Sequence, residues 1–208
     1  EHFVPWPPPT ERQHRVFGLG LSRTGTQSLT SALHVLGLDA VHYPIDADTF
    51  RALSTGALDF QLLETFDGIT DITAARYYAE IDRLHPDAKF ILTVRDEESW
   101  LRSCETHWRG RDPFEAAQTE GRRVHMRIRR FLRASVYGTY EFHPERFRAV
   151  MRKHVDDVRR YFADRPEKLL ELDVVGGAGW EPLCAFLDRP RPTQPFPHKA
   201  SAAATILQ

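Results

Sequence analysis

A segment near the N-terminus has the residue types of a phosphate-binding loop. The stretch VFGLGLSRTGTQSLTSALHVLGL passes from apolar residues through a Gly/Ser/Thr-rich turn into an amphipathic helical pattern. Glycines let the backbone approach an anion closely, and the following helix directs its unpaired N–H groups at the same place. Arg23 adds a permanent charge to this turn. Thr24, Thr26 and Ser28 add hydroxyl donors, and Gly25 and Gln27 complete the set of predicted binding residues in the loop.

This loop differs from the nucleotide-kinase version, which reads G-x-x-x-x-G-K-[ST]. Gly20 and Gly25 have the kinase spacing, but Thr26 stands in place of the Lys. Gln27 stands in place of the hydroxyl residue that holds Mg²⁺. We therefore expect a phosphate cradle that uses no metal. A strand-to-helix turn that is rich in small residues and binds nothing is the alternative.

A second basic group follows the apolar, β-branched run KFILTV. Arg95 stands at the carboxyl end of this predicted strand, on the side of an open α/β sheet where ligands bind. Ser103 lies eight residues later on a predicted helix, and Ser99 lies one turn earlier on the same face. An Arg fork together with a hydroxyl suits a phosphate dianion. The alternative is that Arg95 pairs with Asp96 or Glu97 at the start of the helix.

The two segments together resemble the PAPS-dependent sulfotransferases, in particular their short members of the bacterial type (PAPS is 3′-phosphoadenosine 5′-phosphosulfate). The 5′-phosphosulfate loop of that family has the pattern basic–small–Gly–Thr, and its 3′-phosphate motif has an Arg and a Ser eight residues apart. The resemblance covers residues 15–110 and resumes at LLELDVVGGAGWEPLCAFLDRP. Many members have Lys at the first basic position, so we interpret Arg23, which stays charged, as electrostatic only. The matching residues are Arg23, Thr24, Gly25 and Thr26 for the loop, and Arg95 and Ser103 for the second motif.

The resemblance implies transfer of a sulfuryl group from PAPS to a hydroxyl of a small-molecule acceptor. The product would be adenosine 3′,5′-bisphosphate (PAP), and no metal would be needed. In related sulfotransferases the catalytic base lies between the two motifs, about two dozen residues before the 3′-phosphate Arg. Asp71 fits this position best, Asp67 is second, and His42 is the competing His. The family often has Pro two positions after the carboxylate, where this chain has Thr73. Asp71 could also be a helix N-cap, or serve both roles.

Short apolar runs alternate with helical patterns, which predicts an α/β fold with a mainly parallel central sheet flanked by helices, P-loop-like in its first unit. We expect a single domain over residues 1–208, with an extended, Pro-rich arm at 1–14 and an Arg-rich helical lid at 110–165. The expected strands are 15–19, 40–44, 62–66, 89–94 and 168–174. The expected helices are 26–37, 47–57, 74–85, 97–109, 114–136, 144–164 and 180–187.

The predicted lid carries six arginines in the stretch GRRVHMRIRRFLR, together with an apolar stripe at helical spacing. The favoured interpretation is an amphipathic helix with a solvated basic face. The alternative is that some arginines face the crevice and attract an anionic acceptor or the phosphates of PAPS. His107 and His125 are candidates to line the acceptor pocket from this side.

Composition argues against several classes of partner and location. The net charge of −1 and the absence of a base-stacking surface argue against nucleic acid as a partner. Two cysteines form neither a disulfide framework nor a zinc site, and no 18-residue apolar run spans a membrane, so we expect a cytoplasmic protein. Oligomeric state is not predicted. Two other functions stay open: a P-loop nucleotide kinase or hydrolase, with Asp173 or Asp96 as metal carboxylate, and a nucleotide-binding protein without turnover.

Overall fold

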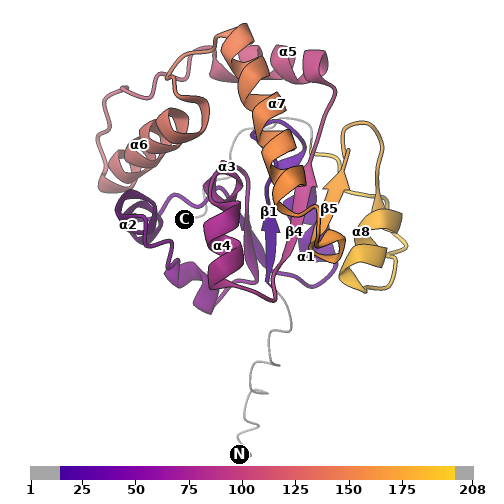
Figure 1. The fold of residues 1–208 in the computed structure, drawn as a ribbon. Helices are drawn as coiled ribbons and strands as arrows, with labels where there is room; N and C mark the ends of the chain where they lie inside the picture. Colours follow the sequence, from indigo (N-terminus) through magenta and orange to yellow (C-terminus); the bar gives the residue numbers. More distant parts are fainter. Residues whose placement is uncertain (1–14, 200–208) are drawn as a thin grey trace, which may run out of the picture.

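Five short parallel strands form the central sheet (Figure 1). The structure is a computed structural model that describes residues 15–199, so the arm expected at 1–14 lies outside the described residues. The strand order is β2-β3-β1-β4-β5, with Phe17 of β1 paired to Ile69 of β3 and to Phe90 of β4. The expected α/β fold with a mainly parallel sheet is confirmed. The strands are β1 Val16–Gly18, β2 Ala40–His42, β3 Gly68–Thr70, β4 Lys89–Thr93 and β5 Leu169–Leu172.

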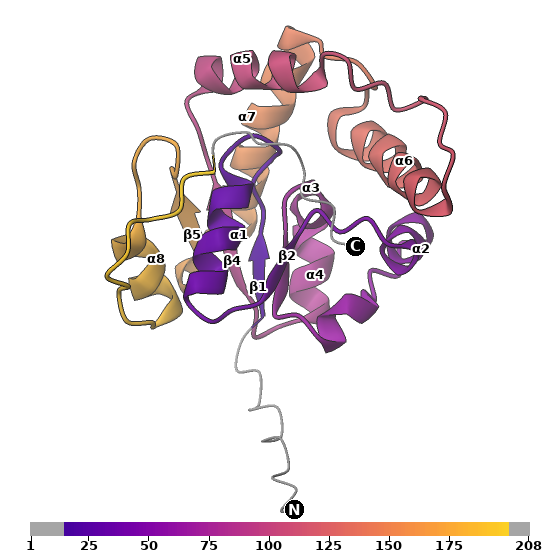
Figure 2. The same ribbon diagram turned by 180° about the vertical axis from the view of Figure 1, so that it is seen from behind.

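Helices cover both faces of the sheet. Figure 1 shows α4 and α7 in front of the strands, and Figure 2 shows α1 and α8 on the opposite face. Helix α5 lies beyond the carboxyl ends of the strands, and α6 lies beside α2. The α-helices are α1 Thr26–Val35, α2 Ala47–Thr55, α3 Ile72–Ala75, α4 Tyr78–Leu84, α5 Glu97–Trp108, α6 Glu120–Leu132, α7 Pro144–Tyr161 and α8 Trp180–Leu187. The other turns are the 3₁₀ helices η1 Gln61–Glu64 and η3 Pro166–Lys168, and the π-helical turn η2 Arg133–Tyr137.

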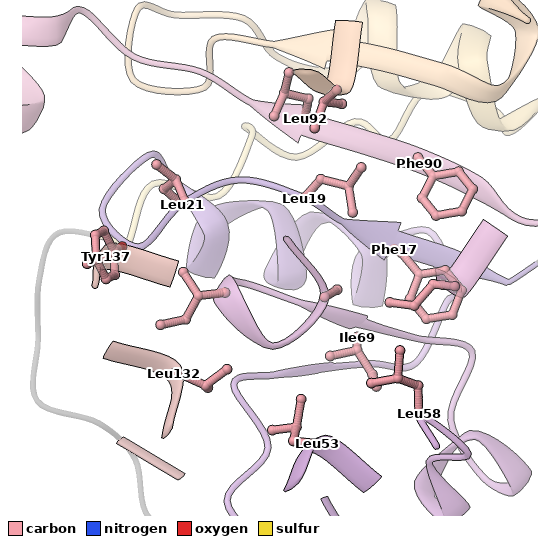
Figure 3. Packing of buried hydrophobic residues seen from close by; sticks show 14 of the residues in the cluster. Phe17, Leu19, Leu21, Leu53, Leu58, Ile69, Phe90, Leu92, Leu132 and Tyr137 are labelled. Carbon is pink, nitrogen blue, oxygen red and sulfur yellow. The ribbon is translucent and has the colours of Figure 1, made fainter. Parts of the chain in front are cut away.

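The strands divide the apolar core in two because successive side chains point to opposite faces of a sheet. Phe17 and Phe90 belong to the larger cluster, under α4, α5, α6 and α7. Val16 and Ile91, one residue away in each strand, belong to the smaller cluster under α1 and α8. Figure 3 shows the larger cluster, which runs along β1 and continues past its end to Tyr137. Strands buried on both faces therefore read as continuous apolar runs.

The strand predicted at 62–66 is wrong. Gln61–Glu64 is a 3₁₀ helix, and the strand β3 is instead Gly68–Thr70, in a stretch that reads as a loop. Gly68 lies so close to β1 that an added Cβ would be 1.8 Å from the Val16 carbonyl oxygen, so this position needs a glycine that sequence patterns associate with turns. The shift places Asp67 and Asp71 at opposite ends of one strand.

The segment 110–165 contributes to two different parts of the fold. In α7, Phe147 and Val158 are fully buried in the larger cluster, and His154 Nε2 lies 2.7 Å from the carbonyl oxygen of Leu19. This helix thus belongs to the body of the protein. Helix α6 and the turn η2 pack on the end of the same cluster beyond β1, where Leu132 and Tyr137 are buried. Within residues 15–199, no helix has both the length and the apolarity needed to cross a membrane.

Candidate active site

The loop between β1 and α1 is fixed by contacts with the neighbouring strand and helix. Trp100 Nε1 of α5 donates a hydrogen bond to the carbonyl oxygen of Ser22 at 2.9 Å, and Arg95 Nη1 donates to that of Arg23 at 2.9 Å. The Thr24 hydroxyl donates to the Leu21 carbonyl oxygen at 2.7 Å. These bonds hold Arg23 at a φ of 78°, an uncommon conformation for a residue with a side chain. The loop is therefore preformed.

Gly20 is required by the close approach of β4. A Cβ at this position would lie 1.7 Å from Thr93 Oγ1 and 2.5 Å from Thr24 Oγ1. The two threonine hydroxyls lie 2.6 Å apart in a hydrogen bond that joins the loop to the end of β4. Gly20 thus allows the loop after β1 to pack closely against the end of β4.

The N-terminus of α1 faces the inside of this loop. Its N-cap residue Gly25 has a φ of 99° and provides no side chain to cap the helix. The first-turn N–H groups and the positive end of the helix dipole are thus directed at an anion-binding position. Two hydroxyls expected to bind the anion have partners within the protein. Thr26 Oγ1 donates to Asp71 Oδ2 at 2.8 Å, and Ser28 Oγ accepts from the backbone N–H of Lys199 at 2.9 Å.

Arg23 and Arg95 lie together, as the sequence predicts, but Ser103, which the sequence pairs with Arg95, is bound by Arg23, and Arg95 binds Ser99 instead. Arg23 Nε donates to Ser103 Oγ at 3.0 Å, and Arg95 donates to Ser99 Oγ at 3.1 Å from Nε and 2.8 Å from Nη2. Both guanidinium groups are half-buried. The ion pairs between described residues give neither of them a carboxylate partner. Two partly desolvated cations without a counterion form a strong anion site.

The acidic residues that follow Arg95 have other roles. Asp96 caps α5, where its Oδ1 accepts from the Ser99 N–H at 2.8 Å. Glu97 pairs with Arg148 and with Arg152 of α7. Asp173, proposed above as a metal carboxylate, accepts from the Gly176 N–H at 2.7 Å in a turn. Groups of three or more metal-ligating side chains do not occur in the part of the chain that the structure describes.

Asp71 lies on the other side of the loop, at the carboxyl end of β3, with 4% of its surface exposed. Its Oδ1 accepts from Ser22 Oγ at 2.6 Å and from the Ile72 N–H at 2.6 Å. Its Oδ2 accepts from Thr26 Oγ1 at 2.8 Å and lies 2.9 Å from His42 Nε2. The bond to Ile72 caps α3, so the N-cap role is present. Asp71 itself has a φ of 74°.

The charge of Asp71 reflects two opposing effects. Burial disfavours the carboxylate, but the hydrogen bond and charge of His42, with hydrogen bonds from Ser22 and Ile72, outweigh burial. The pKa of Asp71 is therefore lowered to about 2, and the group is ionised at neutral pH. His42, at the end of β2, completes this cluster through a 3.0 Å contact with Thr26 Oγ1.

Asp67 is not brought into the site. It precedes β3 at the opposite edge of the sheet from Asp71, and its Oδ2 accepts from the backbone N–H of Asp39 at 2.7 Å. Three strand residues separate the two aspartates, which corresponds to roughly 13 Å along the strand.

His107 and His125 both approach the site from the predicted lid side. Burial, with the charges of Arg111 and Arg23, lowers the pKa of His107 to about 4. Burial, with the charges of Arg129 and Arg122, lowers the pKa of His125 to about 4. Both imidazoles are thus neutral at neutral pH, so they can accept a hydrogen bond from a ligand but do not attract an anion by charge.

Sequence reasoning missed Ser22, Tyr43 and Tyr137. Ser22 lies within the loop and binds Asp71, a role that is visible only once β1 and β3 are adjacent. Tyr43 is the residue after His42, and its ring meets that of His125 edge-on at 6.3 Å between centroids. Tyr137, in η2, lies beside Ser22. Nothing local in the sequence distinguishes these aromatic residues from core residues.

Fold and site together define an α/β protein with a preformed anion-binding loop. The sulfotransferase domain family matches this chain over residues 15–205. "Ava biosynthesis cluster protein M" of Aspergillus versicolor is similar, with 30% identity over 219 residues that cover 92% of this chain and 83% of the relative. The chain therefore belongs to the sulfotransferase family, and its general activity is sulfuryl transfer.

Proposed function

We propose that this protein transfers a sulfuryl group from PAPS to a hydroxyl of a small-molecule acceptor and releases adenosine 3′,5′-bisphosphate. One observation carries the proposal. Arg23 and Arg95, without carboxylate partners among the described residues, lie on one side of the phosphate loop, and the buried Asp71 lies on the other. Sulfuryl transfer needs cations that hold the anionic donor and, next to them, a base that holds the acceptor hydroxyl. The two sides of the loop provide these two groups.

The donor side would bind two phosphate groups. The loop N–H groups, the N-terminus of α1 and Arg23 suit the 5′-phosphosulfate. Arg95 with its partner Ser99, and Ser103 one turn further along α5, suit the 3′-phosphate that distinguishes PAPS from ATP. The serine hydroxyls that now accept from the two arginines can turn to donate to phosphate oxygens, because a hydroxyl does both. Arg23 would then stabilise negative charge on the departing 5′-phosphate.

The transfer itself is an in-line displacement at sulfur. The acceptor oxygen forms a bond to sulfur while the bond from sulfur to the bridging oxygen of the donor breaks. The electron pair of that bond leaves with the 5′-phosphate of adenosine 3′,5′-bisphosphate. The acceptor hydroxyl gives its proton to the Asp71–His42 pair. Positioning and charge stabilisation supply most of the rate enhancement in such a step.

The carboxylate of Asp71 must exchange one hydrogen bond to act as base. Four donors already surround its two oxygens, which is close to their full capacity. Ser22 is the donor best placed to turn away, because it belongs to the loop that would hold the sulfuryl group. Its hydroxyl would then donate to a sulfuryl oxygen as the acceptor hydroxyl takes its place on Asp71.

Calorimetric titration tests the donor. We expect adenosine 3′,5′-bisphosphate to bind tightly without magnesium, and to bind better than ATP with Mg²⁺. Tighter binding of ATP–Mg²⁺ would contradict the proposal and favour a P-loop kinase or hydrolase. Sulfate transfer from labelled PAPS to a panel of hydroxylated acceptors then separates an enzyme from a nucleotide-binding protein without turnover.

A further inference from the structure

The six arginines of the stretch GRRVHMRIRRFLR fall into different environments. Arg122 pairs with Glu115 at 2.9 Å, and Arg123 pairs with Glu120 at 2.7 Å, both near the solvent. Arg129 and Arg133 have no carboxylate partner among residues 15–199. They lie one turn apart, so both point to the same side of α6 and the following turn η2. Arg127 is exposed, so the basic face is solvated at some of its arginines but not at Arg129 and Arg133.

Arg133 is a buried cation, with 5% of its surface exposed. Its guanidinium lies 5.2 Å from the centre of the Trp108 ring, and its Nη1 donates to the Tyr140 carbonyl oxygen at 2.9 Å. Burial and the charge of the neighbouring Arg129 lower its pKa to about 10. Arg129 is half-buried, and its Nη2 lies 3.4 Å from His125 Nε2. Two desolvated like charges next to each other are costly unless an anion joins them.

Two tyrosines connect these arginines with Asp71. Burial and the charge of Asp71 raise the pKa of Tyr43, while the charges of Arg129 and Arg133 lower it. The contacts of Tyr43 agree with this position: its N–H donates to the carbonyl oxygen of Thr70, the residue before Asp71, at 3.3 Å, and its ring meets that of His125, which contacts Arg129. Tyr137 occupies a similar position: its ring meets that of Trp108, which lies under Arg133, at 5.1 Å between centroids, and it lies beside Ser22, which binds Asp71.

The hydroxyl of Tyr137 independently indicates a ligand. Its residue is 0% exposed, and the hydroxyl makes no well-formed hydrogen bond to any described residue, although it lies beside Ser22. The Nε1 of Trp108, the ring under Arg133, is also buried without a partner among the described residues. Buried donors normally have partners, so this region is incomplete as the protein stands alone.

We propose that Arg129 and Arg133 bind a carboxylate of the acceptor, and that the enzyme therefore prefers hydroxy acids. Resting on the sulfuryl transfer proposed above, this assigns the acceptor a hydroxyl at Asp71, an acidic group at the two arginines, and an aromatic or apolar body along Tyr43, Tyr137 and Trp108. Arg23 and Arg95, held by Ser103 and Ser99, already serve the proposed donor, so Arg129 and Arg133 are assigned to the acceptor. Neutral His107 and His125 complete the polar lining.

Matched pairs of ligands test this assignment. Protein saturated with adenosine 3′,5′-bisphosphate is titrated by calorimetry with hydroxybenzoates and hydroxyphenylacetates, each compared with its methyl ester. We expect the best acid to bind about tenfold or more tightly than its ester, because a charged hydrogen bond is lost in the ester. Equal affinity across every pair, or no binding of any acid, would overturn the proposal.

Variants of α6 identify the cations. Arg129→Gln should abolish the preference for the acid while leaving the affinity for adenosine 3′,5′-bisphosphate unchanged. Arg123→Gln removes one charge from an exposed position of the same helix and should keep the preference. Arg133→Lys, which retains the buried charge but not the fork, should weaken the preference. An equal loss of nucleotide affinity in Arg129→Gln would assign this arginine to the donor and overturn the proposal.

The two proposals fail in different ways. If the protein binds adenosine 3′,5′-bisphosphate but shows no acid preference, the acceptor assignment alone is wrong. If the bisphosphate does not bind, the donor is wrong. The same acid and ester titrations without nucleotide, on the wild type and Arg129→Gln, then still decide what the arginines bind.

Discussion

The two sides of the phosphate loop are built in different ways. The donor side uses residues from two short segments, each a strand end followed by a helix, and its arginines are held by serines and by backbone carbonyls. The acceptor side combines Asp71 and His42 from strand ends with aromatic and basic residues of α5, α6 and η2. The residues of the donor side lie in two short sequence motifs, although their hydrogen bonds join segments far apart in the chain. The acceptor side depends on tertiary packing between distant segments.

This difference suggests a division of roles. In the proposed function, a donor site built on β1, β4 and α5 would be rigid and would serve one nucleotide. An acceptor site built on α6 and η2, which pack on α2 and α7, can change without altering that nucleotide site. Substitutions on one side should therefore leave the function of the other side largely unchanged.

The largest effect is expected for Asp71→Asn. Loss of the base should lower turnover by about 10²–10⁴-fold, while the affinity for adenosine 3′,5′-bisphosphate changes little. Asn matches Asp in size and shape, so the substitution removes the charge without placing a new steric demand on the backbone at this positive φ. Steady-state kinetics and calorimetry on the same variant measure the two quantities. Full turnover would exclude Asp71 as the base, and a parallel loss of nucleotide affinity would show that the two sides are coupled through Ser22 and Thr26.

A smaller effect, confined to the donor side, is expected for Arg95→Ala. Its removal should weaken adenosine 3′,5′-bisphosphate by roughly 10–100-fold and weaken adenosine 5′-monophosphate, which lacks the 3′-phosphate, much less. Arg102→Ala, at an exposed position of α5, the helix that follows Arg95, is the matched control and should bind both normally. Equal losses for both nucleotides would mean that Arg95 mainly supports the loop through the Arg23 carbonyl.

The smallest effect is expected for Tyr137→Phe on the acceptor side. The catalytic efficiency for the acceptor should fall tenfold or less, while the free energy of unfolding stays equal or rises, because an unsatisfied buried hydroxyl is removed. Tyr161→Phe makes the contrast: its hydroxyl donates to Asp82 at 3.0 Å, so this variant should lose about 1 kcal/mol of stability and keep its activity. If Tyr137→Phe instead loses stability alone, the Tyr137 hydroxyl is structural.

The fold and the donor side could be predicted from sequence because both depend on local patterns. Strand, loop and helix follow one another within residues 16–38, and Arg95 follows an apolar strand, so both arginines reach the same edge of a parallel sheet. The prediction that Arg95 and Ser103 lie near Arg23 needed only this rule. The sequence motif pairs Ser103 with Arg95, whereas in the structure Ser103 binds Arg23 and Ser99 binds Arg95. This pairing depends on side-chain geometry and did not follow from the rule.

The acceptor side was harder to predict for physical reasons. The strand β3 is three residues long and begins with a glycine selected by contact with β1, so it has no apolar pattern. The choice between Asp67 and Asp71 depended on which end of that strand each occupies. Arg129 and Arg133 belong to the same helical sequence pattern as the solvated arginines. Only their burial in the structure distinguishes these two residues from the others. Such distinctions arise from packing.

The π-helical turn Arg133–Tyr137 gives the acceptor side a simple route to diversify. A π turn contains one residue more than an α-helical turn occupying the same place. Deleting one residue there would restore regular helical spacing and rotate Tyr137 away from Ser22, while Arg129 would keep its position. A change of a single codon could in this way alter which molecules are sulfated and leave the nucleotide chemistry of the enzyme intact.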